Sequence, residues 1–217
     1  MPHFTHLLFD LDGTLTNPRL GIGNSLRYAL WQMQIDGYSA EILEQFIGPP
    51  LQDGFKKLFG MNERNTNLAV EHFRTYFGEK GLYENEPYQG IIELLEELHL
   101  SGKRIYVVTS KLEKYAQMII RHFEFDRYID DLQGAEYSGK HSGKGQLIAQ
   151  MMERNRIFPT SSVVMIGDTH YDMMGATEQG ISSVAVGYGF GTHETLSACD
   201  PDYMVDSVDE LAELLLG

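Results

Sequence analysis

Apolar and polar positions follow two different patterns along the chain. Residues 5–10 are mostly apolar and end in an acidic residue, which is typical of a buried strand that enters a turn. Residues 21–81 instead have apolar positions three and four apart, as in Leu26, Ala29 and Leu30. The sequence therefore predicts one strand followed by a block that contains only helices.

Beyond this block, short apolar runs alternate with segments of helical periodicity. We expect strands at 104–109, 128–132, 162–166, 183–186 and 203–205. We expect helices at 90–100, 114–123, 144–155, 173–179, 194–198 and 208–216. Strands that are apolar throughout and alternate with helices indicate βαβ units and a parallel sheet covered on both faces.

The helical block interrupts this alternation directly after the first strand. The predicted fold class is therefore α/β. Residues 1–17 and 88–217 would form a doubly wound parallel-sheet (Rossmann-like) core. Residues 18–87 would form an inserted all-helical cap domain.

Composition narrows the possible partners and the compartment. Among 217 residues, 31 are acidic and 17 basic, a formal net charge of −14, so we expect neither nucleic acid nor membrane as a partner. The single cysteine, Cys199, cannot form an internal disulfide, and no signal peptide or long apolar run is evident. These features predict a cytoplasmic protein, and we expect a monomer.

Polar residues of catalytic type stand at the ends of three predicted strands. Asp10 and Asp12 follow the first, Thr109 ends the second, and Asp168 and Asp172 follow a third. In a parallel sheet these ends lie at one edge, where ligands bind. We therefore expect the side chains to lie close together.

These residue types suit phosphate chemistry. Asp10 could act as a nucleophile and Asp12 as general acid and then base. With Asp10, the carboxylates of Asp168 and Asp172 would form an oxygen-rich site for Mg²⁺. Thr109 could donate a hydrogen bond to a phosphoryl oxygen, and a lysine would supply positive charge. Each piece alone also reads as an ordinary turn, helix cap or strand end, but the three together at strand ends favour a catalytic site.

These segments resemble the motifs of a known family. The stretch 7–15 (LLFDLDGTL) is similar to the first motif of the haloacid dehalogenase superfamily, 107–111 (VVTSK) to its second and 167–172 to its fourth. The helical insert resembles the type-one cap of that family. Residues 46–51 and 83–90, and a further stretch at 187–189, are similar to its phosphoglycolate phosphatase-like group, often labelled 5'-nucleotidase.

The resemblance implies roles for single residues. Asp10 would be the nucleophile and a Mg²⁺ ligand, and Asp12 the acid and base, with its backbone carbonyl on the metal. Thr109 would bind phosphate, Asp168 would ligate the metal, and Asp172 would support the metal through water.

Three further positions complete the predicted site. The third motif of the family is a lysine, for which Lys140 and Lys144 compete; we favour Lys144, a catalytic and phosphate-binding lysine, because it opens an apolar-periodic helix. Ser110, beside Thr109, and Arg19, just after the first motif, are the remaining predicted substrate contacts.

Asp12 also separates the branches of the family. True dehalogenases and phosphonate hydrolases lack this second aspartate, so the resemblance implies a phosphatase that hydrolyses a small phosphorylated metabolite. A sugar phosphomutase shares Asp12 and stays an alternative, as does a non-catalytic protein that binds a phospho-ligand or metal. A receiver-like module is disfavoured, because receivers are shorter and have no helical insert.

Overall fold

The computed structural model describes residues 4–37, 39–47, 51–137 and 143–217. Lys140 and the Gly-Pro-Pro stretch at 48–50 lie outside this part of the chain. The chain divides into two compact units, one formed by the N-terminal segment up to Thr16 together with Pro87–Gly217, the other by Asn17–Glu86. The two short strands β2 (Thr16–Asn17) and β3 (Glu86–Pro87) pair with each other where the chain passes between the units.

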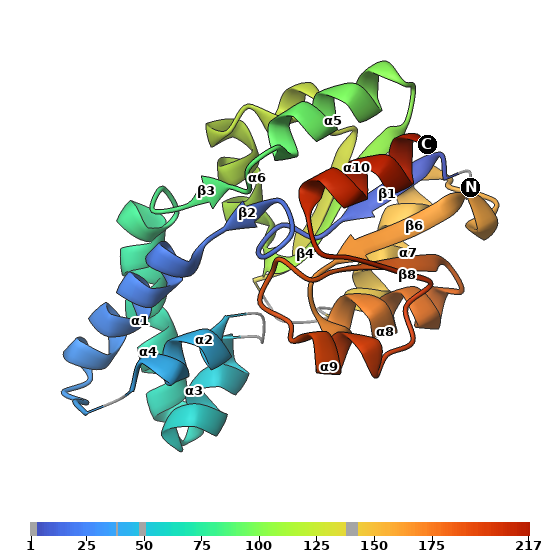
Figure 1. Ribbon diagram of the computed structural model, residues 1–217. Coiled ribbons are helices and arrows are strands. Elements are labelled where there is room, and N and C mark those ends of the chain that lie inside the picture. The colour runs from blue at the N-terminus through green and yellow to red at the C-terminus, as the bar shows by residue number, and fades with distance from the viewer. Residues whose placement is uncertain (1–3, 38, 48–50, 138–142) are drawn as a thin grey trace. The chain divides into compact units, whose positions relative to one another are not determined.

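A six-stranded sheet with the order β5-β4-β1-β6-β7-β8 forms the centre of the first unit (Figure 1). All its described strand pairs are parallel. The strands are β1 (His6–Phe9), β4 (Arg104–Leu112), β5 (Asp131–Ala135), β6 (Val163–Gly167), β7 (Ser182–Val186) and β8 (Tyr203–Val205). This sheet confirms the predicted α/β, Rossmann-like fold class.

Helices cover the sheet because its strands are apolar on both faces. Alternate residues of a strand point to opposite faces, and Leu8, Tyr106 and Met165 pack in one buried cluster with residues of α7 and α8. On the other side, α5 and α10 contact each other. The helices of this unit are α5 (Ile91–Leu100), α6 (Glu113–His122), α7 (Lys144–Asn155), α8 (His170–Gln179), α9 (His193–Ser197) and α10 (Val208–Leu216).

The order of the strands reverses direction at β1. From β1 the core chain continues to β4 and β5 on one side, then crosses to β6, β7 and β8 on the other. Phe9 at the end of β1 is level with Val107 and Ile166 of its two neighbours. In open parallel sheets ligands bind outside the carboxyl ends of the strands at this point of reversal.

The second unit consists of helices. Aromatic side chains form part of its core, with ring centroids of Phe46 and Phe55 4.9 Å apart and those of Phe46 and Phe73 5.9 Å apart. The helices are α1 (Arg19–Gln32), α2 (Ala40–Phe46), α3 (Leu51–Phe59) and α4 (Glu63–Tyr76), followed by a π-helical turn at Phe77–Gly81. The role of this unit as a cap over the site stays a prediction.

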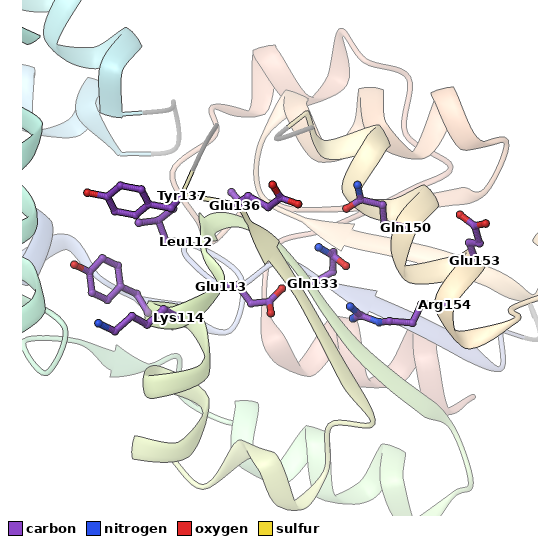
Figure 2. A pocket seen from close by; sticks show the side chains of 11 residues that line it. Leu112, Glu113, Lys114, Gln133, Glu136, Tyr137, Gln150, Glu153 and Arg154 are labelled. Carbon is purple, nitrogen blue, oxygen red and sulfur yellow. The ribbon is translucent and has the colours of Figure 1, made fainter. Parts of the chain in front are cut away.

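Side chains occupy the outer edge of β5, the strand at one end of the sheet. Leu132 donates its N–H to Oδ1 of Asp131, and its carbonyl accepts from Nη2 of Arg154, each at 2.8 Å. Gly134 donates to Oε2 of Glu113 and accepts from Nε2 of Gln133. Figure 2 shows Glu113, Gln133 and Arg154 along this strand. All four backbone groups of Leu132 and Gly134 are thus hydrogen-bonded to side chains.

The largest difference from the predicted elements concerns this strand. We expected it at 128–132, but Phe125–Arg127 form a 3-10 helix and the strand covers Asp131–Ala135. The prediction did not extend the strand to Ala135, because it contains Gly134 and glycine is disfavoured in strands. The fold requires glycine there, because a Cβ would lie 2.4 Å from Cα of Glu113.

Two other elements, β4 and α8, have boundaries three residues away from the predicted ones. The strand predicted at 104–109 continues to Leu112, and its register against β5 shifts between Val108 and Leu112. The helix predicted from Met173 begins at His170. Over the described residues, no helix is both long and apolar enough to span a membrane.

Candidate active site

Asp10 lies directly beyond β1, at the reversal point of the sheet. Its N–H donates to the carbonyl of Ile166 at 2.9 Å, so the residue continues the sheet although the strand ends at Phe9. The residue is only 8% exposed in relative terms. Burial raises the pKa of the Asp10 carboxyl to about 6, an effect that Lys144 opposes only in part.

The lysine at the start of α7 contacts two of the predicted carboxylates. Nζ of Lys144 lies 2.9 Å from Oδ1 of Asp10 and 2.6 Å from Oδ1 of Asp172, and it donates to the carbonyl of Val108 at 3.0 Å. Three oxygens therefore surround an ammonium that carries three hydrogens. Burial alone would lower the pKa of Lys144, but Asp10 and Asp172 more than offset this and raise it, so the side chain is a cation at neutral pH.

Close packing of two helices brings this lysine to the acidic residues. A Cβ on Gly175 of α8 would lie 2.8 Å from Cγ of Lys144 and 3.0 Å from N of Gly145, both on α7. Only a glycine at position 175 lets α7 and α8 approach this closely. The approach sets Lys144 beside Asp172, three residues before Gly175 on α8.

Asp172 also caps a helix, the role that the sequence analysis gave as the alternative reading of this motif. Its Oδ2 accepts hydrogen bonds from N of Thr169 at 3.0 Å and from Oγ1 of Thr169 at 2.8 Å. Together with the bond from N of Asp172 back to Thr169, this is a capping box at the start of α8. One oxygen of Asp172 therefore fixes the helix and the other holds Lys144. Its predicted support of a metal stays a prediction.

Asp168 is fully buried beneath the turn that follows β1. Its Oδ2 accepts from N of Phe190 at 2.8 Å, and its Oδ1 accepts from Oγ1 of Thr14 at 3.3 Å. Gly13 (φ 90°) and Gly189 make room for it, since a Cβ at these positions would lie 2.1 Å and 2.3 Å from Asp168 atoms. Burial, reinforced by neighbouring carboxylates, raises the pKa of Asp168 well above its ordinary value.

Asp10, Asp168 and Asp172 form a buried acidic cluster that fits a divalent cation. One oxygen of each lies within 4.8 Å of those of the other two. The ammonium of Lys144 contacts two of these three carboxylates, and burial of excess negative charge is costly unless a cation or protons compensate it. The raised pKa values of Asp10 and Asp168 express that cost. Carboxylate oxygens are ligands that Mg²⁺ accepts, so the residues suit the predicted metal.

Thr109 and Asp12 complete the site from β4 and from the turn after β1. Thr109 is 2% exposed, and its Oγ1 accepts from N of Lys111 at 3.2 Å, which leaves the hydroxyl hydrogen available to donate. Nζ of Lys111 lies 2.5 Å from Oδ2 of Asp12. Asp10, Asp12, Thr109 and Asp168 therefore lie on or just beyond the adjoining strands β1, β4 and β6, and Asp172 and Lys144 lie in the first turns of α8 and α7.

Ser110 and Arg19 are the two remaining predicted substrate contacts. Ser110 lies in β4 between Thr109 and Lys111 and is half-buried. Arg19 begins α1 and belongs to the helical unit. Their roles stay predictions.

The sequence reading matched Lys111 and the loop that follows β7 to family motifs but gave them no role in the site. Lys111 is two residues from Thr109, so strand alternation could have placed both on one face. In the loop, Tyr188 donates its hydroxyl to the carbonyl of Thr14 at 3.1 Å, next to the contacts of Phe190 and Gly189 with Asp168. Its glycine-rich sequence was a usable signal for close backbone approach.

A pocket of about 730 Å³ lies elsewhere in this unit, between the end of β4, the start of α6, β5 and α7 (Figure 2). Lys114, Gln133 and Arg154 are among its lining residues. None of Asp10, Asp12, Asp168 and Asp172 lines it.

Comparison with known proteins assigns the family. The model of the haloacid dehalogenase-like hydrolases matches residues 7–186. A 5'-nucleotidase of Pseudomonas aeruginosa is 40% identical over 212 residues, which cover 98% of this chain and 96% of that protein. The crystal structure of a predicted phosphatase from Clostridium acetobutylicum superposes with a TM-score of 0.92 at 38% identity and covers 98% of both chains. The tyrosine-protein kinase PtkA of Mycobacterium tuberculosis is 31% identical over 96% of this chain and 72% of its own.

The chain therefore belongs to the haloacid dehalogenase-like hydrolase family, as the sequence motifs indicated. The names of relatives that share 38–40% of its residues over nearly their whole length confirm the predicted enzyme class, a phosphatase of this family.

Proposed function

We propose that the protein is a Mg²⁺-dependent phosphomonoester hydrolase that works through an aspartyl-phosphate on Asp10. The observation that carries this proposal is the position of Asp10, buried at the end of β1, with one oxygen within 4.8 Å of the Asp168 and Asp172 ligand atoms and 2.9 Å from Nζ of Lys144. A carboxylate in such a setting can attack a phosphoryl group whose charge is compensated.

The residues would act in two steps. In the first, an Asp10 oxygen attacks phosphorus, the bond from phosphorus to the leaving oxygen breaks, and Asp12 gives its proton to that oxygen. In the second, Asp12 as a carboxylate takes a proton from water, whose oxygen attacks phosphorus. The bond to Asp10 then breaks, inorganic phosphate leaves, and both aspartates regain their starting state.

Thr109 and Lys144 would assist without changing their bonds. The Thr109 hydroxyl would donate to a phosphoryl oxygen, and Lys144 would hold Asp10 and Asp172 in place as a counter-charge. Asp10, Asp168 and the Asp12 backbone carbonyl would hold Mg²⁺, with Asp172 behind them. When bound, the ion supplies positive charge that permits two anions, the nucleophile and the phosphate, to meet.

The substrate would be a small phosphorylated metabolite. The relative named 5'-nucleotidase favours nucleoside 5'-monophosphates as the first class to test, and the phosphoglycolate phosphatase-like motifs favour small phosphorylated acids as the second. In this proposal the helical unit acts as the cap, and Arg19 and Ser110 contact the substrate.

Phosphate release tests the proposal. Purified protein is incubated with p-nitrophenyl phosphate, nucleoside 5'-monophosphates, 2-phosphoglycolate and sugar phosphates, in Mg²⁺ and in EDTA. We expect release that requires Mg²⁺ and that Asp10→Asn abolishes, whereas Asp126→Asn, an exposed carboxylate of the same unit, leaves it unchanged. Mass spectrometry of acid-quenched protein should find phosphate on Asp10.

Other outcomes lead to the alternatives. Conversion of one sugar phosphate into its isomer without free phosphate would identify a mutase. A folded protein that binds Mg²⁺ but turns over nothing would point to a non-catalytic role. Full activity of Asp10→Asn would exclude the aspartyl-phosphate.

A further inference from the structure

Lys111 is a charged residue of the site to which neither the mechanism above nor the sequence reading gives a function. It lies on β4, two residues beyond Thr109, where the register between β4 and β5 shifts. Its ammonium lies 2.5 Å from Oδ2 of Asp12, and the two side chains are 8% and 18% exposed. The contact is therefore largely shielded from water, so solvent does little to weaken it.

The two oxygens of Asp12 differ in their surroundings. Oδ2 contacts Lys111, whereas Oδ1 is buried and accepts no hydrogen bond from the described residues. A buried carboxylate oxygen without a donor is costly, and such an atom in a site is accounted for when a ligand supplies the missing hydrogen bond. A leaving-group oxygen or a water would be that partner.

Lys111 also contacts the residue expected to bind phosphate. Its N–H donates to Oγ1 of Thr109 at 3.2 Å, while its ammonium holds Asp12. One residue thereby ties the turn after β1 to the end of β4. The other lysine of the site cannot take this part, because Nζ of Lys144 is surrounded by Asp10, Asp172 and the carbonyl of Val108.

We propose that Lys111 is a positioning residue that holds Asp12 by Oδ2 and so presents Oδ1 as the oxygen that exchanges the proton. This inference rests on the proposed phosphatase function and adds one positioning residue to it. Without Lys111 the Asp12 side chain is free to rotate, and the proton is no longer delivered along a fixed direction. Proton transfer of this kind contributes about 10²- to 10⁴-fold to rate.

Two substrates whose leaving groups differ in their need for a proton distinguish a positioning role of Lys111 from a role in phosphate binding or folding. p-Nitrophenolate is a stable anion that departs without a proton, whereas an alkoxide must be protonated as it leaves. The quantity to compare is kcat/KM, because it reports the steps up to the departure of the leaving group. We expect Lys111→Met to lower kcat/KM for n-propyl phosphate about 100-fold and that for p-nitrophenyl phosphate less than about threefold.

Two variants accompany this measurement. Lys111→Arg keeps a cation within reach of Oδ2 and should recover at least about tenfold of the n-propyl phosphate activity. If Lys111→Met does not fold, Lys111→Arg is compared with wild type instead. Any loss of kcat/KM that Lys111→Arg shows should then be confined to n-propyl phosphate. Lys114→Met, a change at an exposed lysine three residues further along, should behave as wild type.

The outcomes are distinct. Equal losses on both substrates would mean that Lys111 binds phosphate or supports the fold, and would overturn the inference while the phosphatase function stands. An unchanged Lys111→Met would overturn it as well. Wild-type protein that hydrolyses neither substrate would overturn the proposed function, and the inference with it.

Discussion

The ammonium of Lys144 lies 2.6 Å from Oδ1 of Asp172, the oxygen that does not take part in capping α8. Both side chains are almost inaccessible, at 3% and 0%. A single carboxylate thus connects the first turn of a helix to the lysine that faces Asp10. Stability of α8 and orientation of the site are coupled through it.

Loss of the cap should therefore affect both stability and activity. Thr169→Ala removes the hydroxyl bond to Asp172, and we expect a loss of about 1 kcal/mol in the free energy of unfolding. That corresponds to a fall in Tm of about 2–4 °C for a chain of this size. Because Asp172 then holds Lys144 less firmly, kcat should fall several-fold. Thermal denaturation and phosphate release measure the two effects.

Ser207→Ala is the matched control for this change. Ser207 caps α10 by accepting from N of Glu210 at 3.2 Å, and it contacts none of the acidic cluster. We expect a similar loss of stability with unchanged kcat. Equal effects of both variants on kcat would contradict the coupling.

Removal of the ammonium should destabilise the metal-free protein strongly. Lys144→Met leaves Asp10 and Asp172 buried without their counter-charge, and loss of one partner of a buried pair costs about 3–5 kcal/mol. The loss should shrink at acidic pH, where the carboxylates bind protons instead. Denaturant unfolding in EDTA at pH 5 and pH 7.5 measures it, and an identical loss at both values would argue against this explanation.

Ionisation of Asp10 should lower the stability of the metal-free protein. Its pKa is raised from 3.8 to about 6 in the folded state, so the folded chain binds more protons than the unfolded chain between these values. Stability is then greatest below pH 3.8 for this group and is lost as pH rises through 6, by up to about 3 kcal/mol.

Asp10→Asn removes this titration. In EDTA at pH 7.5 the variant should unfold at a temperature equal to or above that of wild type, and the difference should disappear towards pH 4. In Mg²⁺ the order should reverse, because wild type alone retains all three carboxylates for the ion. A variant less stable than wild type in EDTA at pH 7.5 would contradict the raised pKa.

Gly189→Ala should disturb Asp168 and the turn after β1, since the new Cβ would also lie 2.5 Å from the carbonyl oxygen of Gly13. The added Cβ would lie 2.3 Å from Cβ of Asp168, so one of them must move. We expect at least a tenfold loss of Mg²⁺ affinity and a matching loss of activity at limiting metal, measured by calorimetry and phosphate release. Gly102→Ala, where no atom lies within 4 Å of the new Cβ, should cost stability through its positive φ but leave Mg²⁺ binding unchanged.

Most of the core could be predicted because its pattern is local. The strands β1, β6 and β7 each contain a buried apolar run, at 7–9, 163–166 and 184–186, and helices such as α7 and α10 were predicted at their observed bounds. The local pattern does not predict an element whose residues are determined by a tertiary contact. The strand β5 contains Gly134 because the backbone of Glu113 approaches it, and this glycine is absent from the pattern expected of a strand. The start of α8 was placed three residues late, because a helix cap at 167–172 was weighed but the helix was not extended back to His170, which the capping box of Thr169 and Asp172 allows.

The candidate site was predictable in its residues more than in its contacts. Strand ends bring Asp10, Thr109 and Asp168 to one place by topology alone. The partner of each side chain depends on turns and on helix packing, so neither the pair of Lys111 with Asp12 nor the contact of Lys144 with Asp172 followed from spacing.

The hydrogen-bonded edge of β5 bears on how the protein behaves at high concentration. An open edge strand is a template on which a second chain can add, the first step of domain swapping and of amyloid growth. Here Arg154 and Glu113, charged residues from two helices, fill the backbone positions that an incoming strand would need. A strand of a second chain would have to displace those side chains before it formed its first hydrogen bond with β5. We therefore expect this edge of the sheet to resist templated self-assembly.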